Sequence, residues 1–352
     1  MSLALTPETA ECRRVHLPLL SNSSLTTFRR CPREYQFRYV MMRKPRRKSD
    51  ALRFGSLFHV GLNAWWLTSD VPPSARLYVA VEAVRRASEK DDTDPFDLVK
   101  AECLLVGYTA RWGDERYTTI AVEKQFRLPI ENVGPTNVMA DLGGAIDAIA
   151  QDEAAHCETL ATHLVEHKTT SSDISAGSDY WRHVVALDPQ VSTYMSAAKA
   201  LGYDPRDTIY DVVRKPTLLP LKATPEDARR YTKPTKAEPI PRLYSNQREY
   251  DETPEEYRER LMADIASRPD WYFQRKTIVR LERDHAEHAR DVMHTAEMIR
   301  FAEERDAWPR SPNACERYGR LCEYHPVCSG ETNIEDDTRY ATKTKQHEEL
   351  DP

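Results

Sequence analysis

The spacing of apolar residues changes from a helical to a strand period near residue 118. Before it, 53–66 and two stretches within 74–112 repeat apolar positions every three to four residues, as one face of a helix does. The turn-forming sequence DDTDP at 91–95 separates these two stretches. We therefore predict a helical insertion over about 62–117, ahead of the first long strand.

Later segments rich in β-branched and apolar residues predict strands. They are 118–130, 143–150, 162–171, 208–215 and 271–280. A helix is expected at 188–202, where Asp188 can cap and Pro189 suits the first helical position. Helices followed by a short sheet that a helix interrupts indicate an α/β fold, in which a short mixed sheet is flanked by helices.

Helix signals also mark both ends of the chain. SNSSLTTFRRCPREYQFRYV at 21–40 predicts a helix capped by Asn22 or Ser23 and a second helix starting at Pro32. Thr253 is followed by a proline and a capping-box acid, so it starts another helix, and a long helix is expected over 282–306.

We expect a single domain over 21–329 of the 352 residues. Residues 1–20 are expected as a loose lead-in and 330–352 as a frayed polar tail. The proline-rich segment 216–242 is predicted to be a long excursion, which in compact proteins is usually functional. A gate for the substrate and a partner-docking loop are both open interpretations of this segment.

The composition, 40% hydrophobic and 30% charged, is typical of a soluble globular protein. The sequence contains no apolar run of bilayer length and no basic-then-apolar leader, so we expect a cytoplasmic protein without a membrane partner.

Charge is unevenly distributed along the chain. The net charge of −6 argues against non-specific coating of nucleic acid, yet residues 29–48 hold nine Lys or Arg and one acid, Glu34. Such a stretch with interleaved aromatics suits phosphate contacts, although a solvated basic helix with an aromatic inner face is an equal alternative. The predicted DNA contacts are Arg43, Lys44, Arg46, Arg47 and Lys48.

Two carboxylates and a lysine are candidates for catalysis. Residues two apart in a strand share a face, so Glu166 and Lys168 project together and His167 faces away, with no chemistry assigned. Pairing across the turn near 151–156 would bring Asp147 close to Glu166, and neighbouring carboxylates with hard oxygen ligands favour Mg²⁺ or Mn²⁺. Taken alone, an E-x-K pair is more often a structural ion pair.

Three further residues extend this candidate site. Gln190 and Tyr194 lie four apart and share a helix face. His59 is a potential metal ligand, although a lone histidine is more often simply packed or solvated. Asp141 is an alternative to Asp147 as the carboxylate of the preceding strand.

Seven cysteines are present, an odd number that argues against a disulfide framework. Three of them crowd into fourteen residues near the C-terminus, at 315, 322 and 328.

The series GSLFH, GGAIDAI, VEHKTT and QVSTY resembles the ordered motifs of RecB-like PD-(D/E)XK nucleases. The opening at 21–40 resembles the iron–sulfur branch of that family, which includes the nuclease end of AddB and the CRISPR-associated RecB-like exonucleases. The resemblance implies a bacterial or phage-infected host cell and leaves a phage or prophage origin open. The likeness covers 21–328. It implies that His59, Asp147 and Glu166 bind Mg²⁺ or Mn²⁺, that Lys168 acts on the attacking water, and that Gln190 and Tyr194 hold the site and the DNA strand in register.

The same resemblance implies a [4Fe–4S] cluster held by Cys31, Cys315, Cys322 and Cys328. The spacing here is C-x6-C-x5-C, whereas the family more often shows C-x2-C-x5-C. A four-thiolate zinc site is therefore an alternative, with His325 as a reserve ligand. Either group would join the two ends of the chain.

These observations predict a metal-dependent deoxyribonuclease, an exonuclease on single strands or duplex ends, acting in recombination, repair or phage DNA processing. A helicase, annealing or recombination protein is the expected partner. The alternative is a catalytically silent DNA-binding or scaffolding module on the same fold. The complete set of His59, Asp147, Glu166 and Lys168 favours the enzyme.

Overall fold

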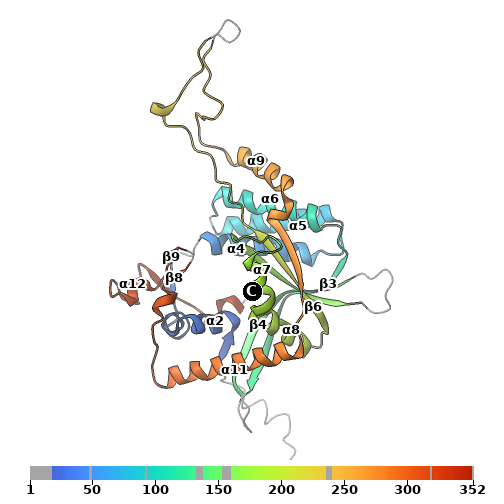
Figure 1. Cartoon of the computed structure of the whole chain (residues 1–352), viewed down its shortest axis with the longest axis vertical. Helices are drawn as coiled ribbons and strands as arrows, with labels where there is room; N and C mark the ends of the chain where they lie inside the picture. The colour runs from blue at the N-terminus through green and yellow to red at the C-terminus, as the bar shows by residue number, and fades with distance from the viewer. Residues whose placement is uncertain are drawn as a thin grey trace, which may run out of the picture.

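A six-stranded mixed sheet forms the centre of the molecule in the computed structural model (Figure 1). The structure describes residues 18–46, 50–91, 93–131, 138–152, 160–234, 240–317 and 319–350. The strands are β1 (Leu19–Ser21), β3 (Tyr117–Glu131), β4 (Val138–Asp152), β5 (Thr162–Thr170), β6 (Pro205–Arg214) and β7 (Phe273–Ile278). Their order is β1-β4-β5-β6-β7, with β3 on the other edge of β4. The predicted strands therefore exist.

Strand β4 has two different pairing partners along one of its edges. One of its edges pairs with β3 along nearly its whole length. The other edge pairs with β1 from Asp141 to Gly143, and then with β5 from Ala148 to Gln151. Over residues 144–147 this edge of β4 therefore pairs with neither β1 nor β5, and the two neighbouring strands diverge there.

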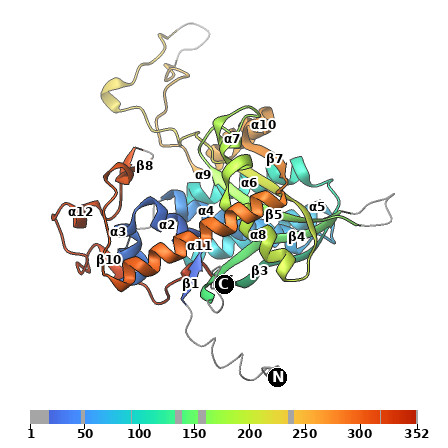
Figure 2. The ribbon, with the colours of Figure 1, turned by 60° about the horizontal axis from the view of Figure 1, so that its bottom comes forward.

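Helices cover both faces of the sheet (Figures 1 and 2). On one face lie α4 (Asp50–Leu67), α5 (Pro73–Lys90), α6 (Pro95–Trp112) and α9 (Pro254–Ser267), and on the other α7 (Asp179–Leu187) and α8 (Pro189–Ala200). Val165 packs with the first group and its neighbour Leu164 with the second, as the two-residue strand period requires. This arrangement confirms the α/β fold with a mixed sheet between helices.

The two ends of the chain pack together beside the sheet (Figure 2). The N-terminal part comprises α2 (Asn22–Arg30), α3 (Pro32–Tyr35), the π-helix η1 (Gln36–Val40) and β2 (Arg43–Pro45). The C-terminal part comprises α11 (Glu282–Glu304), η3 (Pro312–Ala314), β8 (Glu316–Arg317), β9 (Arg320–Leu321), α12 (His325–Cys328), β10 (Tyr340–Thr342) and η4 (Glu348–Leu350). β2 pairs with β10, and the apolar side of α2 packs on α11.

Two expectations about the ends were wrong in detail. The cap of α2 is Ser21, which forms a capping box with Ser24, rather than Asn22 or Ser23. Residues 330–350 are not frayed, because Tyr340 and His347 are buried and His347 Nε2 lies 2.7 Å from the Leu19 carbonyl oxygen.

Between β6 and α9 the chain leaves the body as a long arm, yellow in Figure 1, with a short helix η2 (Glu226–Ala228). The short helix α10 (Pro269–Tyr272) then leads into β7. Within the described residues, no helix has the length and apolar character needed to cross a membrane.

Candidate active site

The six residues singled out as a catalytic set line one cavity of about 640 Å³ between α4, β4, β5 and α8. They are His59, Asp147, Glu166, Lys168, Gln190 and Tyr194. Asp141 is not among the lining residues, since it lies earlier in β4 and pairs with Arg127. The geometry therefore selects Asp147 as the strand carboxylate facing the cavity.

Asp147 and Glu166 bring two carboxylates together on neighbouring strands. Asp147 Oδ2 accepts a hydrogen bond of 2.7 Å from the His167 backbone N–H, which ties the divergent part of β4 to β5. Glu166 is 2% exposed, and burial, with the Asp147 charge as the next cause, raises its pKa to about 8. Its Oε2 atom is buried and has no hydrogen-bond partner among the described residues. An unpartnered buried carboxylate oxygen of this kind is suited to a cation.

A chain of hydrogen bonds holds Lys168 beside Glu166. Lys168 Nζ donates to Glu166 Oε1 and, at 2.7 Å, to Gln190 Oε1. Gln190 Nε2 in turn donates to the Tyr194 hydroxyl at 2.8 Å, as the shared helix face predicted. Burial alone would lower the pKa of Lys168, but the carboxylates of Glu166 and Asp147 raise it overall, so this residue is an ammonium ion.

His59 approaches the same carboxylates from α4. Its Nε2 atom lies 3.1 Å from the His167 carbonyl oxygen. Burial, aided by nearby His167 and Lys168 and opposed by Asp147, lowers the pKa of His59. A neutral imidazole is the form that binds metals.

Glu123 is a site residue that the sequence analysis missed. Ligand atoms of His59, Glu123 and Asp147 all lie within 4.8 Å of one another. Glu123 has φ 50°, a left-handed conformation that costs energy in a non-glycine residue and is concentrated at functional sites. Asn63 Nδ2 donates to it at 2.6 Å, while burial and the Asp147 charge raise its pKa. The only sequence signal was an acid inside a strand next to the Asp147 strand.

This donor set fits a hard divalent cation. Three carboxylates and one neutral imidazole converge on the cavity, and one of the carboxylate oxygens is buried without a partner. Mg²⁺ and Mn²⁺ prefer such oxygen-rich sites.

His167 faces the opposite side of the sheet, as expected. Its Nδ1 atom lies 3.2 Å from Asp211 Oδ2, and Asp211 is also bonded by Arg275 and by the Tyr108 hydroxyl at 2.6 Å. Burial alone would raise the pKa of Asp211, but Arg275 and His167 lower it overall. This buried network packs on the face of β5 opposite to Glu166 and Lys168.

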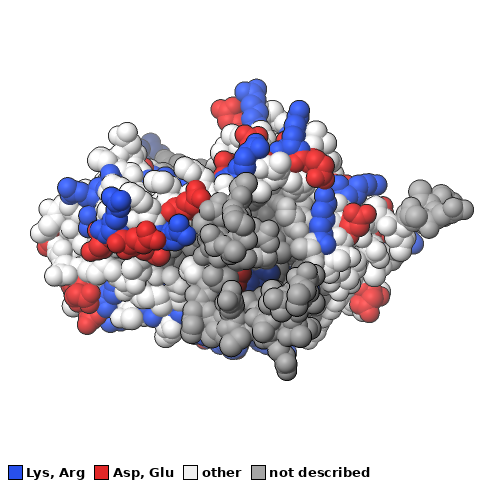
Figure 3. Space-filling view, turned by 90° about the horizontal axis from the view of Figure 1, so that it is seen from below, with Lys and Arg blue, Asp and Glu red and all other residues white. Residues whose placement is uncertain are grey.

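The predicted basic DNA-binding segment is largely occupied by structural contacts. Arg43 is 5% exposed, so it is not available to phosphates, and its guanidinium donates to the Ile334 carbonyl and to Asp337. Lys44 pairs with Glu348, and Arg46 bonds the Asp337 carbonyl. Arg47 and Lys48 lie outside the described residues. The face in Figure 3 mixes Lys and Arg with Asp and Glu.

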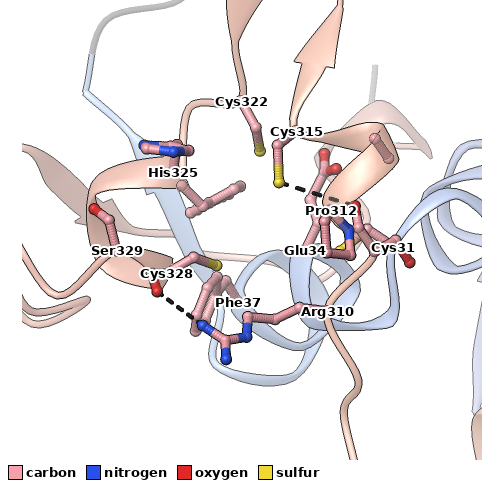
Figure 4. A pocket seen from close by; sticks show the side chains of 13 residues that line it. Cys31, Glu34, Phe37, Arg310, Pro312, Cys315, Cys322, His325, Cys328 and Ser329 are labelled. Atoms are coloured by element: carbon pink, nitrogen blue, oxygen red, sulfur yellow. Dashed lines mark hydrogen bonds between the residues drawn. The ribbon is translucent and has the colours of Figure 1, made fainter.

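The four cysteines of the predicted cluster line a second cavity, of about 430 Å³ (Figure 4). Cys31 comes from the α2–α3 junction, whereas Cys315, Cys322 and Cys328 come from the C-terminal part. All four are free thiols. Burial, then nearby Glu34 and the neighbouring sulfurs, raises the pKa of Cys322 to about 11.

Apolar side chains complete this second cavity, among them Phe37 and Tyr324, and His325 lines it as well. A site of thiols in an apolar surround fits a soft metal or an iron–sulfur cluster. Cys103, on α6, is instead packed in the hydrophobic core of the protein.

One family profile and two solved structures are similar to this chain. The profile of the PD-(D/E)XK nuclease superfamily matches residues 19–329. The chain is similar to the crystal structure of a candidate exonuclease from Eubacterium rectale, with 12% identity, a TM-score of 0.44, and coverage of 91% of this chain and 95% of that one. It is also similar to the structure of SSO0001, with 12% identity, a TM-score of 0.26, and coverage of 74% and 81%. The comparison with curated proteins gave no match. Because the profile spans most of its length, the chain belongs to the PD-(D/E)XK nuclease superfamily.

Proposed function

We propose that the protein is a Mg²⁺- or Mn²⁺-dependent deoxyribonuclease, acting as an exonuclease on single strands or duplex ends. The observation that carries the proposal is the convergence of His59, Asp147, Glu166 and Lys168 on one cavity, with Glu166 Oε2 buried and unpartnered. Members of the superfamily generally use a divalent metal, and the donor set fits one.

The roles of the residues follow from their contacts. His59, Asp147 and Glu166 would hold the cation, with Glu123 as an added ligand. A bound Mg²⁺ or Mn²⁺ supplies Lewis-acid catalysis and activates water. Lys168, kept as an ammonium ion between Glu166 and Gln190, would stabilise negative charge developing on the phosphate. Tyr194 fixes Gln190, and so positions Lys168.

The test is an anaerobic assay on end-labelled single- and double-stranded DNA, with Mn²⁺ or Mg²⁺ compared with EDTA. Lys168→Ala is expected to lower cleavage by at least about 100-fold, as loss of a transition-state charge contact does. Lys90→Ala, an exposed lysine at the end of α5, is the matched control. Stepwise products would support the exonuclease, whereas internal cuts would reassign it as an endonuclease.

A catalytically silent DNA-binding module on the same fold is the alternative. Metal-independent DNA binding without cleavage by folded wild-type protein would favour it. The complete residue set in one cavity instead favours turnover. We place the nuclease in recombination, repair or phage DNA processing, with a helicase, annealing or recombination partner, on the resemblance of its motifs.

We also propose that Cys31, Cys315, Cys322 and Cys328 hold a [4Fe–4S] cluster, as in the iron–sulfur branch. The support is that four free thiols from both ends of the chain line one cavity. Zinc is the alternative occupant, and the two are separated by visible absorbance with iron, sulfide and zinc analysis. Cys328→Ser should remove the absorbance and Cys103→Ala should keep it; a colourless wild type with bound zinc would overturn the iron–sulfur assignment.

A further inference from the structure

The arm between β6 and α9 is a built structure rather than a loose loop. We define the arm as residues 217–251, of which 217–234 and 240–251 are described. Its two segments run antiparallel. The Thr232 N–H donates to the Arg242 carbonyl at 2.8 Å, and the Tyr244 N–H donates to the Arg230 carbonyl at 3.0 Å. The Gln247 side chain adds bonds to the facing segment.

The base of the arm is clamped to the body. Glu252 is buried and accepts two hydrogen bonds from Arg260, at 2.8 and 2.6 Å, and one from the Leu221 N–H at 2.7 Å. The Tyr257 hydroxyl on α9 donates to the Leu218 carbonyl at 2.8 Å. These bonds fix the direction in which the arm leaves the body.

Beyond its root, where Leu218 packs against the core beside α6 and α9, the arm contributes nothing to a core. No side chain in its described part is buried, and Tyr231, Ile240 and Tyr244 are 52%, 74% and 44% exposed. An isolated two-stranded ribbon is marginally stable in water. A two-stranded ribbon that is held at its base but has no core of its own is therefore suited to contact a partner outside the chain.

The basic part of the arm is its outer part, and this charge identifies the kind of partner. Residues 228–234 and 240–248 hold five Lys or Arg and no Asp or Glu, whereas the rest of the described arm holds one lysine and four acids, Lys222, Glu226, Asp227, Glu249 and Asp251. The facing pairs place Arg230, Arg242 and Tyr244 on one face of the ribbon, because residues opposite one another in an antiparallel pair share a face. Cations beside an exposed aromatic ring match the phosphates and bases of a nucleic acid.

We propose that the arm binds DNA at a distance from the cavity, with Arg230 and Arg242 on phosphates and Tyr244 against a base. This inference rests on the proposed nuclease function. The place where the arm leaves the body supports this proposal, since Lys215, two residues before the arm, lines the cavity that holds Asp147 and Glu166. About ten extended residues span on the order of 30 Å, close to one turn of DNA. The contact should therefore matter for long DNA and not for very short pieces.

The test is DNA binding by fluorescence anisotropy in EDTA, across a salt series. The arm variant carries Arg230→Ala, Arg242→Ala and Tyr244→Ala. The control variant carries Tyr78→Ala, Arg86→Ala and Lys90→Ala on α5, which are also exposed. On strands of about 30 nucleotides the arm variant should bind about 10- to 100-fold more weakly, with a salt slope smaller by about 1 to 2. On strands of about six nucleotides both variants should match the wild type.

Wild-type affinity and salt slope in the arm variant would overturn the inference and point to an acidic protein as the partner. Cleavage by the wild type is measured in parallel with Mn²⁺. If the wild type cuts DNA while the arm variant binds DNA normally, only the inference about the arm is wrong. If the wild type neither binds nor cuts DNA, the proposed nuclease function itself is wrong.

Discussion

At the residue scale, Glu123 shows how one backbone angle changes a site. Its left-handed φ of 50° interrupts the regular strand opposite Asp147, and its carboxylate reaches the ligand atoms of His59 and Asp147. The period of the strand could predict which face Glu166 and Lys168 share, and did so correctly. It could not predict Glu123, because an irregular backbone angle leaves no mark in the hydrophobic pattern.

Glu123→Gln should raise the Mn²⁺ concentration for half-maximal cleavage by about tenfold, since outer or added ligands typically affect metal affinity by that amount. The measurement is cleavage rate against Mn²⁺ concentration. Glu89→Gln, on the exposed side of α5, is the control. An unchanged Mn²⁺ dependence in Glu123→Gln would remove Glu123 from the ligand set.

Arg43 gives a second residue-scale prediction. Its buried guanidinium holds the C-terminal segment through Ile334, Asp337 and Thr342, so Arg43→Ala should destabilise the fold by about 2–4 kcal/mol. Chemical unfolding measures this, with the exposed Arg86→Ala as control. A loss of DNA affinity without a loss of stability would restore the predicted phosphate contact.

At the element scale, helices α8 and α11 are joined by a partly buried histidine, His288. His288 Nε2 lies 2.8 Å from Thr193 Oγ1. Burial lowers the pKa of His288 to about 4, helped by Arg29, His285 and Arg280 and opposed by Asp291. The folded pKa lies below the ordinary value of 6.5, so the stabilisation is fully present above pH 6.5 and is lost as the pH falls towards 4.

His288→Gln, which can keep the bond to Thr193, should therefore lose less stability than the wild type on going from pH 6.5 to 4. The difference should be about 2 kcal/mol, a figure reduced from the full shift for partial exposure. Urea unfolding across this pH range measures it. Parallel pH profiles for the two proteins would show that folding does not lower the pKa of His288.

Element boundaries were predictable where local signals were strong. The Thr253 capping box and Pro189 at the first helical position both occur as expected. The placement of segment 330–350 was not predictable, because the residues that it contacts lie some 300 positions away in the sequence. The Lys343 N–H donates to the Met42 carbonyl and His347 contacts Leu19.

At the scale of the whole molecule, the cysteine site joins residue 31 to the 315–328 segment and so closes nearly the entire chain. Closing a loop of this length restricts the unfolded chain, and the stabilisation expected is about 5–6 kcal/mol. If the proposed cluster is present, its oxidative removal should lower the unfolding midpoint accordingly, as calorimetry of loaded and cluster-free protein would show. Equal midpoints would mean that the two ends of the chain stay packed together without a metal group.

The most direct test of the central claim is Mn²⁺ binding by electron paramagnetic resonance, with DNA cleavage measured on the same samples. The wild type should bind Mn²⁺ and cleave in proportion to its occupancy. Asp147→Asn should lose both, whereas Asp141→Asn, which removes only the pair with Arg127, should keep both. Undiminished cleavage by Asp147→Asn would contradict the account.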